Sequence, residues 1–167
     1  MKRTTIATAA LMLAVGCLDK PSKPPDPIVG AVGTITLSGA MTSTFSSAPI
    51  TASCIAGHCT IVITAAAPPP FFGAHVNLSA EPAVRTYSMS DPDKSASVSA
   101  SNSTGGGAAT WSAAIFPSGP DRGTFSLVLT EVGPKATGDE FLIHGTFDAT
   151  LTAESPATGT VTVHVVF

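Results

Sequence analysis

Apolar and polar residues alternate with a period of two along most of the chain beyond residue 30, which is the pattern of half-buried β-strands. Four segments show it best: 34–38, 123–130, 143–151 and 160–167. In the third of these, Ile143 and Phe147 share one face, while His144 and Asp148 share the other. The polar turn Ser155-Pro-Ala-Thr-Gly159 separates the last two segments, so we expect them to pair as an antiparallel hairpin.

Shorter or weaker segments complete the predicted sheet. They are 40–45, 50–54, 59–64, 84–88, 95–100 and 110–116. No helical periodicity follows the first residues, and Gly and Pro punctuate the strands at short intervals. This pattern predicts an all-β fold, a single antiparallel β-sandwich of about nine strands that is immunoglobulin-like in outline. A fold of this kind assigns no function by itself.

The first seventeen residues have a different character. Lys2 and Arg3 precede an apolar run from Ile6 to Val15, and small residues then lead to Cys17. A helix needs about 20 apolar residues to cross a bilayer, so this run is too short for a transmembrane span. The order of charged, apolar and small residues is instead that of a secretory signal.

The end of this signal, Ala14-Val-Gly-Cys17, resembles the lipobox of bacterial lipoproteins. The resemblance implies that the Cys17 thiol receives a diacylglycerol and that the cysteine becomes the acylated first residue of the mature chain. Leu18 stands where aspartate would signal inner-membrane retention, so the resemblance favours the outer membrane or the cell surface. The alternative is an ordinary cleaved signal in which Cys17 is incidental.

These features divide the chain into three parts. Residues 1–16 form the lipoprotein signal peptide, 17–29 a Pro-rich tether, and 30–167 the β-sandwich domain. Four prolines fall between Leu18 and Pro27, which makes that stretch extended and semi-rigid.

Charge excludes one class of partner. Without Lys2 and Arg3 the mature chain keeps six cationic against eleven acidic residues, a net charge of −5. Nucleic acid and anionic lipid headgroups both call for basic patches, so we expect no nucleic-acid partner. Only 11% of residues are charged, against about 25% in typical soluble domains. The predicted surface is therefore neutral and rich in hydroxyl groups.

Two cysteines and a histidine lie close together in Ser53-Cys-Ile-Ala-Gly-His-Cys59. In an exported protein Cys54 and Cys59 are expected to form a disulfide, here closing a hairpin over the four-residue turn Ile55–His58. Two alternatives stay open. One is a metal site with Cys54, His58 and Cys59 as ligands, which lacks a fourth ligand and the usual zinc spacing. The other is a redox pair, whose common motif has two intervening residues rather than four.

The segment Ala65-Ala-Ala-Pro-Pro-Pro-Phe-Phe-Gly-Ala-His75 is interpreted as a loop stiffened by prolines. Adjacent Phe71 and Phe72 cannot both point inward from an extended chain. One ring is then a candidate contact for a partner, because a rigid exposed aromatic binds at low entropic cost. The interpretation that we favour from the sequence is that the loop folds back and both rings plug one end of the sandwich, since large apolar residues are usually covered.

Other polar groups are weaker candidates. His144 and His164 are predicted on the outer face of the last hairpin, with Asp148 near His164, an arrangement able to ligate a metal or exchange protons. The pairs Asp91 with Asp93 and Asp139 with Glu140 lack the dense acidic spacing of calcium loops. We favour the simpler interpretation for all of them, solvated surface residues and ordinary turns.

No catalytic motif is present in the sequence: it has no Gly-x-Ser-x-Gly, no His-Glu-x-x-His and no phosphate-binding loop. We therefore expect a lipid-anchored, non-enzymatic binding or structural module without a cofactor. Its membrane contact is the lipid on Cys17, and its partner is an envelope protein or a glycan. The alternatives are an extracytoplasmic hydrolase acting on an envelope or extracellular polymer, and a metal-handling lipoprotein.

Overall fold

The computed structural model describes residues 31–66, 69–91, 95–103, 108–115, 121–135 and 139–167. The predicted signal peptide, Cys17 and the tether lie outside these residues. The described residues form ten β-strands and no helix, which confirms the all-β class and corrects the expected number of about nine. The strands are β1 (Ala31–Gly39), β2 (Ser43–Ile55), β3 (His58–Ala66), β4 (Phe71–Leu78), β5 (Thr86–Ser88), β6 (Ser95–Ser103), β7 (Ala108–Ile115), β8 (Thr124–Lys135), β9 (Glu140–Glu154) and β10 (Thr160–Val166).

All pairings between these strands are antiparallel, and they join the ten strands into one sheet in the order β10-β1-β2-β3-β4-β6-β7-β9-β8-β5. Strand β9 also pairs with β10 and β2, so the pairings form a closed circuit. This continuity differs from the two separate sheets of an immunoglobulin-type sandwich.

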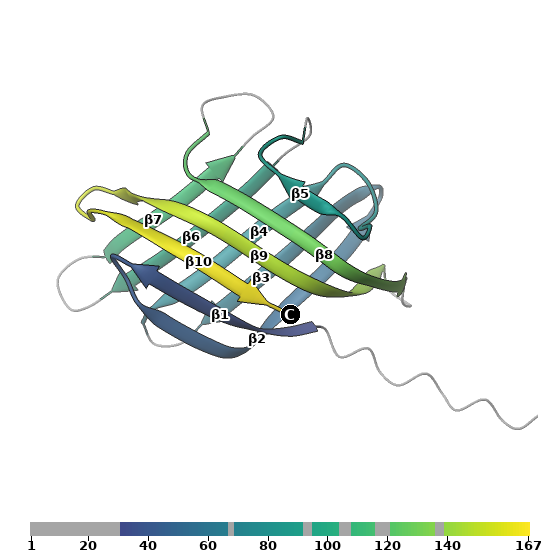
Figure 1. Ribbon diagram of the computed structural model, residues 1–167, viewed down its shortest axis with the longest axis horizontal. Helices are drawn as coiled ribbons and strands as arrows, with labels where there is room; N and C mark the ends of the chain where they lie inside the picture. The colour runs from purple at the N-terminus through teal and green to yellow at the C-terminus, as the bar shows by residue number, and fades with distance from the viewer. Residues whose placement is uncertain (1–30, 67–68, 92–94, 104–107, 116–120, 136–138) are drawn as a thin grey trace, which may run out of the picture.

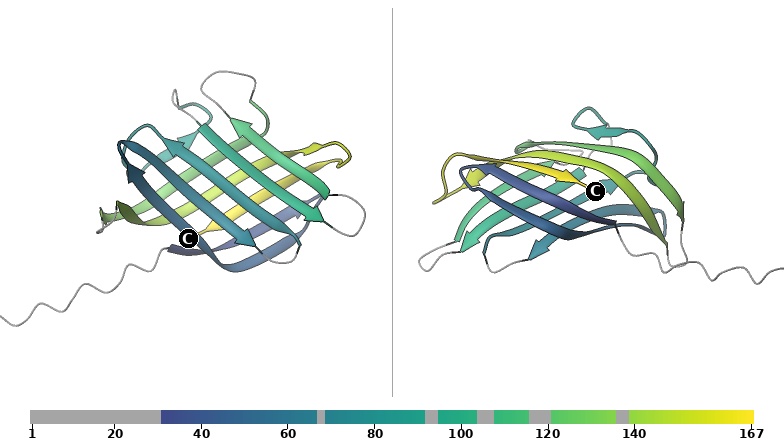
Figure 2. Two further views of the ribbon diagram at one scale, coloured as in Figure 1. Left: turned by 180° about the vertical axis from the view of Figure 1, so that it is seen from behind. Right: turned by 60° about the horizontal axis from the view of Figure 1, so that its bottom comes forward.

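The sheet folds into two layers that face each other (Figure 1). Strands β1, β10, β9, β8 and β5 form the front layer. β2 pairs with β1 along its first half and with β3 along its second half, and so curves into the back layer, which it forms with β3, β4, β6 and β7 and whose outer side is seen in the left view of Figure 2. The strands of the two layers run across one another. The apolar core fills the space between them.

Alternation along each strand sends apolar side chains into this core and polar ones to solvent. In β1 the burial pattern alternates strictly from Ala31 to Ser38, and Ile35 and Leu37 are fully buried. No polar or charged side chain is buried among the described residues. The polar tips of the two large amphipathic rings reach backbone atoms: Trp111 Nε1 donates to the Thr158 carbonyl oxygen (3.2 Å), and the Ala83 amide donates to Tyr87 Oη (2.8 Å). The polar atoms of these two buried rings therefore have hydrogen-bond partners, and the core needs no network of polar side chains.

Two sequence predictions about strands were wrong. The segment 40–45 is not a strand of its own, because β1 ends at Gly39 and Phe45 lies within β2. The segment 65–75, interpreted as a loop, contains the end of β3 and the start of β4. Proline disfavours a strand interior, but here the prolines precede the strand and do not interrupt it.

Gly145, in the middle of β9, has the tightest surroundings of the described glycines. A Cβ built at this position would collide with the Val128 carbonyl oxygen of β8. The Gly145 amide donates to the Phe167 carbonyl oxygen (2.8 Å), and the Phe167 amide donates back (3.0 Å). Gly73, in β4, is the opposite case, because a Cβ there would have no atom within 4 Å.

We predict that Gly145→Ala lowers the free energy of unfolding by about 1–3 kcal/mol, since the clash is with backbone that cannot rotate away. Gly73→Ala is the matched control, and its effect should lie within about 1 kcal/mol of zero or be stabilising. Urea unfolding followed by Trp111 fluorescence measures both. Equal destabilisation by the two variants would contradict the close approach at Gly145.

Candidate functional site

The hairpin of β2 and β3 carries the disulfide predicted from the sequence. Cys54 and Cys59 are directly opposed in the β2–β3 register and are bonded to each other. Their side chains point into the core, with 5% and 2% exposure. The turn is shorter than expected, since Ala56 and Gly57 alone form it, both with positive φ. Two-residue hairpin turns with positive φ at both positions match the twist of the flanking strands.

His58 does not join these cysteines. It is exposed on the outer side of β3, while the neighbouring Cys59 points inward. The described residues contain no group of three or more His, Cys, Asp or Glu side chains able to hold a metal ion. The three-ligand alternative of Cys54, His58 and Cys59 is therefore not assembled in this structure.

Phe71 and Phe72 open strand β4 and point to opposite sides of the back layer. Phe72 is 3% exposed and belongs to the core, whereas Phe71 is 43% exposed. The favoured interpretation, with both rings in the core, is thus wrong for Phe71. Pro69 and Pro70 immediately precede the strand and set the start of β4, where the register opposes Phe71 to Ala66 and Ser101.

The surroundings of Phe71 leave much of its ring exposed. Its two cross-strand neighbours, Ala66 and Ser101, have small side chains. Two residues further along the same face comes Gly73, which has no side chain at all. Gly73 lies between Thr64 of β3 and Ser99 of β6. Beyond it stands exposed His75. We call the outward positions Thr64, Ala66, Phe71, Gly73, His75, Ser99 and Ser101 the Phe71 face.

Beside this face a chain of hydrogen bonds links three strands. Thr60 Oγ1 donates to Asn77 Oδ1 (3.1 Å), and Asn77 Nδ2 donates to Ser95 Oγ (3.1 Å). The whole back layer shares one further property: none of the residues of β2, β3, β4, β6 and β7 is Asp, Glu, Lys or Arg. The outward side chains of these strands therefore include no carboxylate, ammonium or guanidinium group, and Ser and Thr occupy most outward positions.

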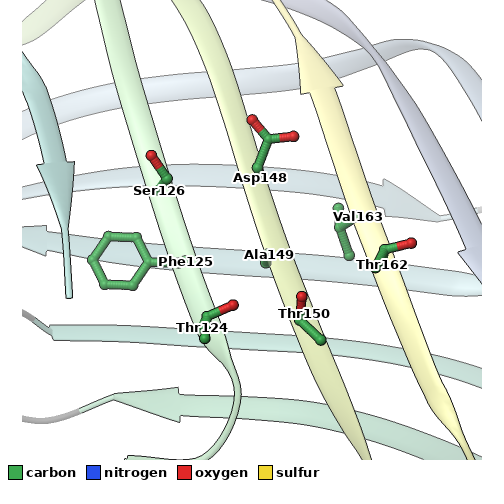
Figure 3. Close-up of a pocket in the computed structure, with 8 residues that line it drawn as sticks. All are labelled: Thr124, Phe125, Ser126, Asp148, Ala149, Thr150, Thr162 and Val163. Carbon is green, nitrogen blue, oxygen red and sulfur yellow. The ribbon is translucent and has the colours of Figure 1, made fainter.

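The front layer carries a second candidate. Register aligns Ser126 of β8, Asp148 of β9 and His164 of β10 in one row across the outer side. The predicted proximity is present, because His164 Nδ1 lies 2.7 Å from Asp148 Oδ1. Asp148 also lines an open pocket of about 240 Å³, whose lining residues are drawn in Figure 3. Its polar lining consists of Thr124, Ser126, Asp148, Thr150 and Thr162.

The order of groups in this row does not suit nucleophilic catalysis. A relay needs the imidazole between the carboxylate and the attacking hydroxyl, whereas Asp148 lies between Ser126 and His164. Asp148 and His164 are each 54% exposed, so solvent screens their interaction. His144 is also exposed, and its cross-strand neighbour in β8 is Glu131. The pocket can offer hydrogen bonds to a small polar molecule, but it gives no sign of an activated nucleophile.

Asp91, in the first of the acidic turns, has structural partners. Asp91 accepts a hydrogen bond from the Ser88 amide (2.7 Å) and pairs with Arg85 (3.5 Å). The Arg85 guanidinium stacks over the Tyr87 ring at 4.0 Å, and a hydrogen bond to Tyr87 is the main cause that raises the pKa of Arg85. Asp93 lies outside the described residues. Glu140 is exposed at the start of β9, and Asp139 precedes it with positive φ.

Comparison with protein-family models, with curated proteins and with solved structures gives no match. The site is therefore argued from its own geometry. Within the described ranges, no helix is long and apolar enough to span a membrane.

We predict that replacing both Cys54 and Cys59 by Ala lowers the free energy of unfolding by about 2 kcal/mol, the loop-entropy value for so short a loop. The comparison is urea unfolding of the oxidised protein and of the double variant. Because both sulfurs are buried, reductant should act only as the protein unfolds. Free thiols in the denatured, unreduced protein would contradict the bond.

Alanine substitutions of the two phenylalanines should differ in their effect on stability. Phe72→Ala is expected to lower the free energy of unfolding by about 3–5 kcal/mol, as for other buried aromatics. Phe71→Ala should lower it by less than about 1 kcal/mol, because the Phe71 ring contributes little to the core. Thermal and urea unfolding of both variants measure the difference. A large loss for Phe71→Ala would place that ring in the core and remove it from any binding role.

Proposed function

We propose that the protein is a lipid-anchored binding module of the bacterial cell envelope, held to the outer membrane or cell surface through Cys17. Two features support the location: the lipobox-like end of its signal sequence and a disulfide suited to an oxidising compartment. The tether 17–29 would hold the domain away from the lipid.

The observation that carries the binding role is the Phe71 ring, which is 43% exposed at a position where both cross-strand neighbours, Ala66 and Ser101, are small. A chain that alternates so regularly could place a Ser or Thr there, as it does at most outward positions of the same layer. A large apolar ring on a polar surface is typical of a contact residue. The partner contact is therefore assigned to the Phe71 face.

The anchor can be tested by intact mass. Expressed in a bacterial host, the protein should yield a chain that begins at Cys17 with added acyl mass and gains two daltons on reduction. Cys17→Ala should lose the acyl mass and leave the membrane fraction. An unacylated wild-type chain would remove the lipoprotein proposal and leave an ordinary exported protein.

A further inference from the structure

We infer that the Phe71 face binds an uncharged polysaccharide, one sugar ring lying over Gly73 against the Phe71 ring. This deepens the proposed function, on which the biological setting of the ligand rests. The geometry of the face stands independently of the anchor.

The first argument is the shape of the face. Gly73 forms an open floor, because a Cβ at this position meets no atom within 4 Å. Phe71 borders this floor at one end and His75 at the other, on the same side of β4. Thr64 and Ser99 flank it on the neighbouring strands. Strands lie about 4.8 Å apart, so these flanking residues are about 10 Å from each other across the floor.

The second argument is the chemistry of the lining. A pyranose ring has apolar C–H faces and hydroxyl groups around its rim. The exposed ring of Phe71 can pack against such a face, as aromatic rings do with apolar surfaces. The hydroxyl groups of Thr64 and Ser99 both donate and accept hydrogen bonds, which suits sugar hydroxyls that do the same. The imidazole of His75 adds one more polar contact.

The third argument is charge. Strands β2, β3, β4, β6 and β7 contain no Asp, Glu, Lys or Arg. Arg122 and Glu154 border the layer at β7, where they pair with each other (3.3 Å) and Glu154 accepts a hydrogen bond from Ser112, so the two charges offset each other. Nucleic acids and sulfated or phosphorylated polymers need cationic contacts. Protein interfaces have cores enriched in Tyr, Trp, Met and Arg and depleted in Ser, whereas the exposed large apolar side chains of this layer are Phe71 and, outside the Phe71 face, Ile55, among many serines. A neutral polymer is the partner that matches it.

Gly73→Val provides the decisive variant. A valine fits the strand and meets open space, so the domain should fold normally, while the side chain fills the floor on which the sugar lies. Phe71→Ala removes the ring. Thr36→Val is the matched control, a β-branched substitution at an exposed strand position on the front layer, far from the face.

The experiment is affinity electrophoresis of the full chain carrying Cys17→Ala in native gels. The gels contain dextran, pullulan, mannan or laminarin, with dextran sulfate as the charged counterpart of dextran. We expect at least one neutral polymer to retard the protein. Both Phe71→Ala and Gly73→Val should weaken its apparent affinity about tenfold or more, the loss of one stacked contact, and Thr36→Val should not.

Several results would overturn the inference: no retardation in any neutral polymer, stronger retardation by dextran sulfate than by dextran, or retardation that Gly73→Val leaves unchanged. A concentration-dependent dimer that Gly73→Val abolishes, measured by light scattering, would assign the face to a second copy of the chain. Acylated Cys17 without polysaccharide binding would defeat this inference alone. Polysaccharide binding without acylation would defeat only the anchor.

Discussion

The pairing of strand β9 with four other strands is the constraint on which the rest of the structure depends. β9 begins beside β2, ends beside β7, and pairs along its length with β8 and β10, so it ties the back layer to the front layer at both ends. That path requires close backbone contact at Gly145, where β8 and the C-terminal residue both approach. Because side chains alternate with a period of two, a one-residue slip of β9 would turn Phe147 outward and Asp148 into an apolar core.

Closure of the pairing circuit also limits exposed strand edges. In the described part of the chain the order ends at β5, which spans only Thr86–Ser88 and is held by the buried Tyr87 ring. A short edge strand offers few free backbone groups to another chain. β5 pairs with three residues of the longer β8, Ser126–Val128. The outer sides of the two layers display side chains rather than backbone.

Much of this fold could be predicted from alternation alone, because the inward positions are almost uniformly apolar and the polar ones face water. The final hairpin and the disulfide followed directly. Strand β4 was not predicted, because three prolines and two adjacent phenylalanines suggested a loop. Apolar residues do occur at every second position there, at Phe72, Ala74, Val76 and Leu78. The closed circuit could not be predicted, since it depends on pairings between strands distant in sequence. The role proposed for Gly73 could not be predicted from the sequence either, because it depends on the residues that the strand register places beside this glycine.

The uncharged back layer calls for a physical reason beyond folding. Outward strand positions bear little of the stability, so charges there cost almost nothing, and they improve solubility. The front layer and the turns do carry such charges, including Asp148, Glu131 and Arg122. Their absence from five adjacent strands therefore has no explanation in the core, which lies on the other side of the sheet. The proposed neutral partner would account for it, because a charge buried against such a partner would lose its water without compensation, whereas hydroxyl groups can form hydrogen bonds with it.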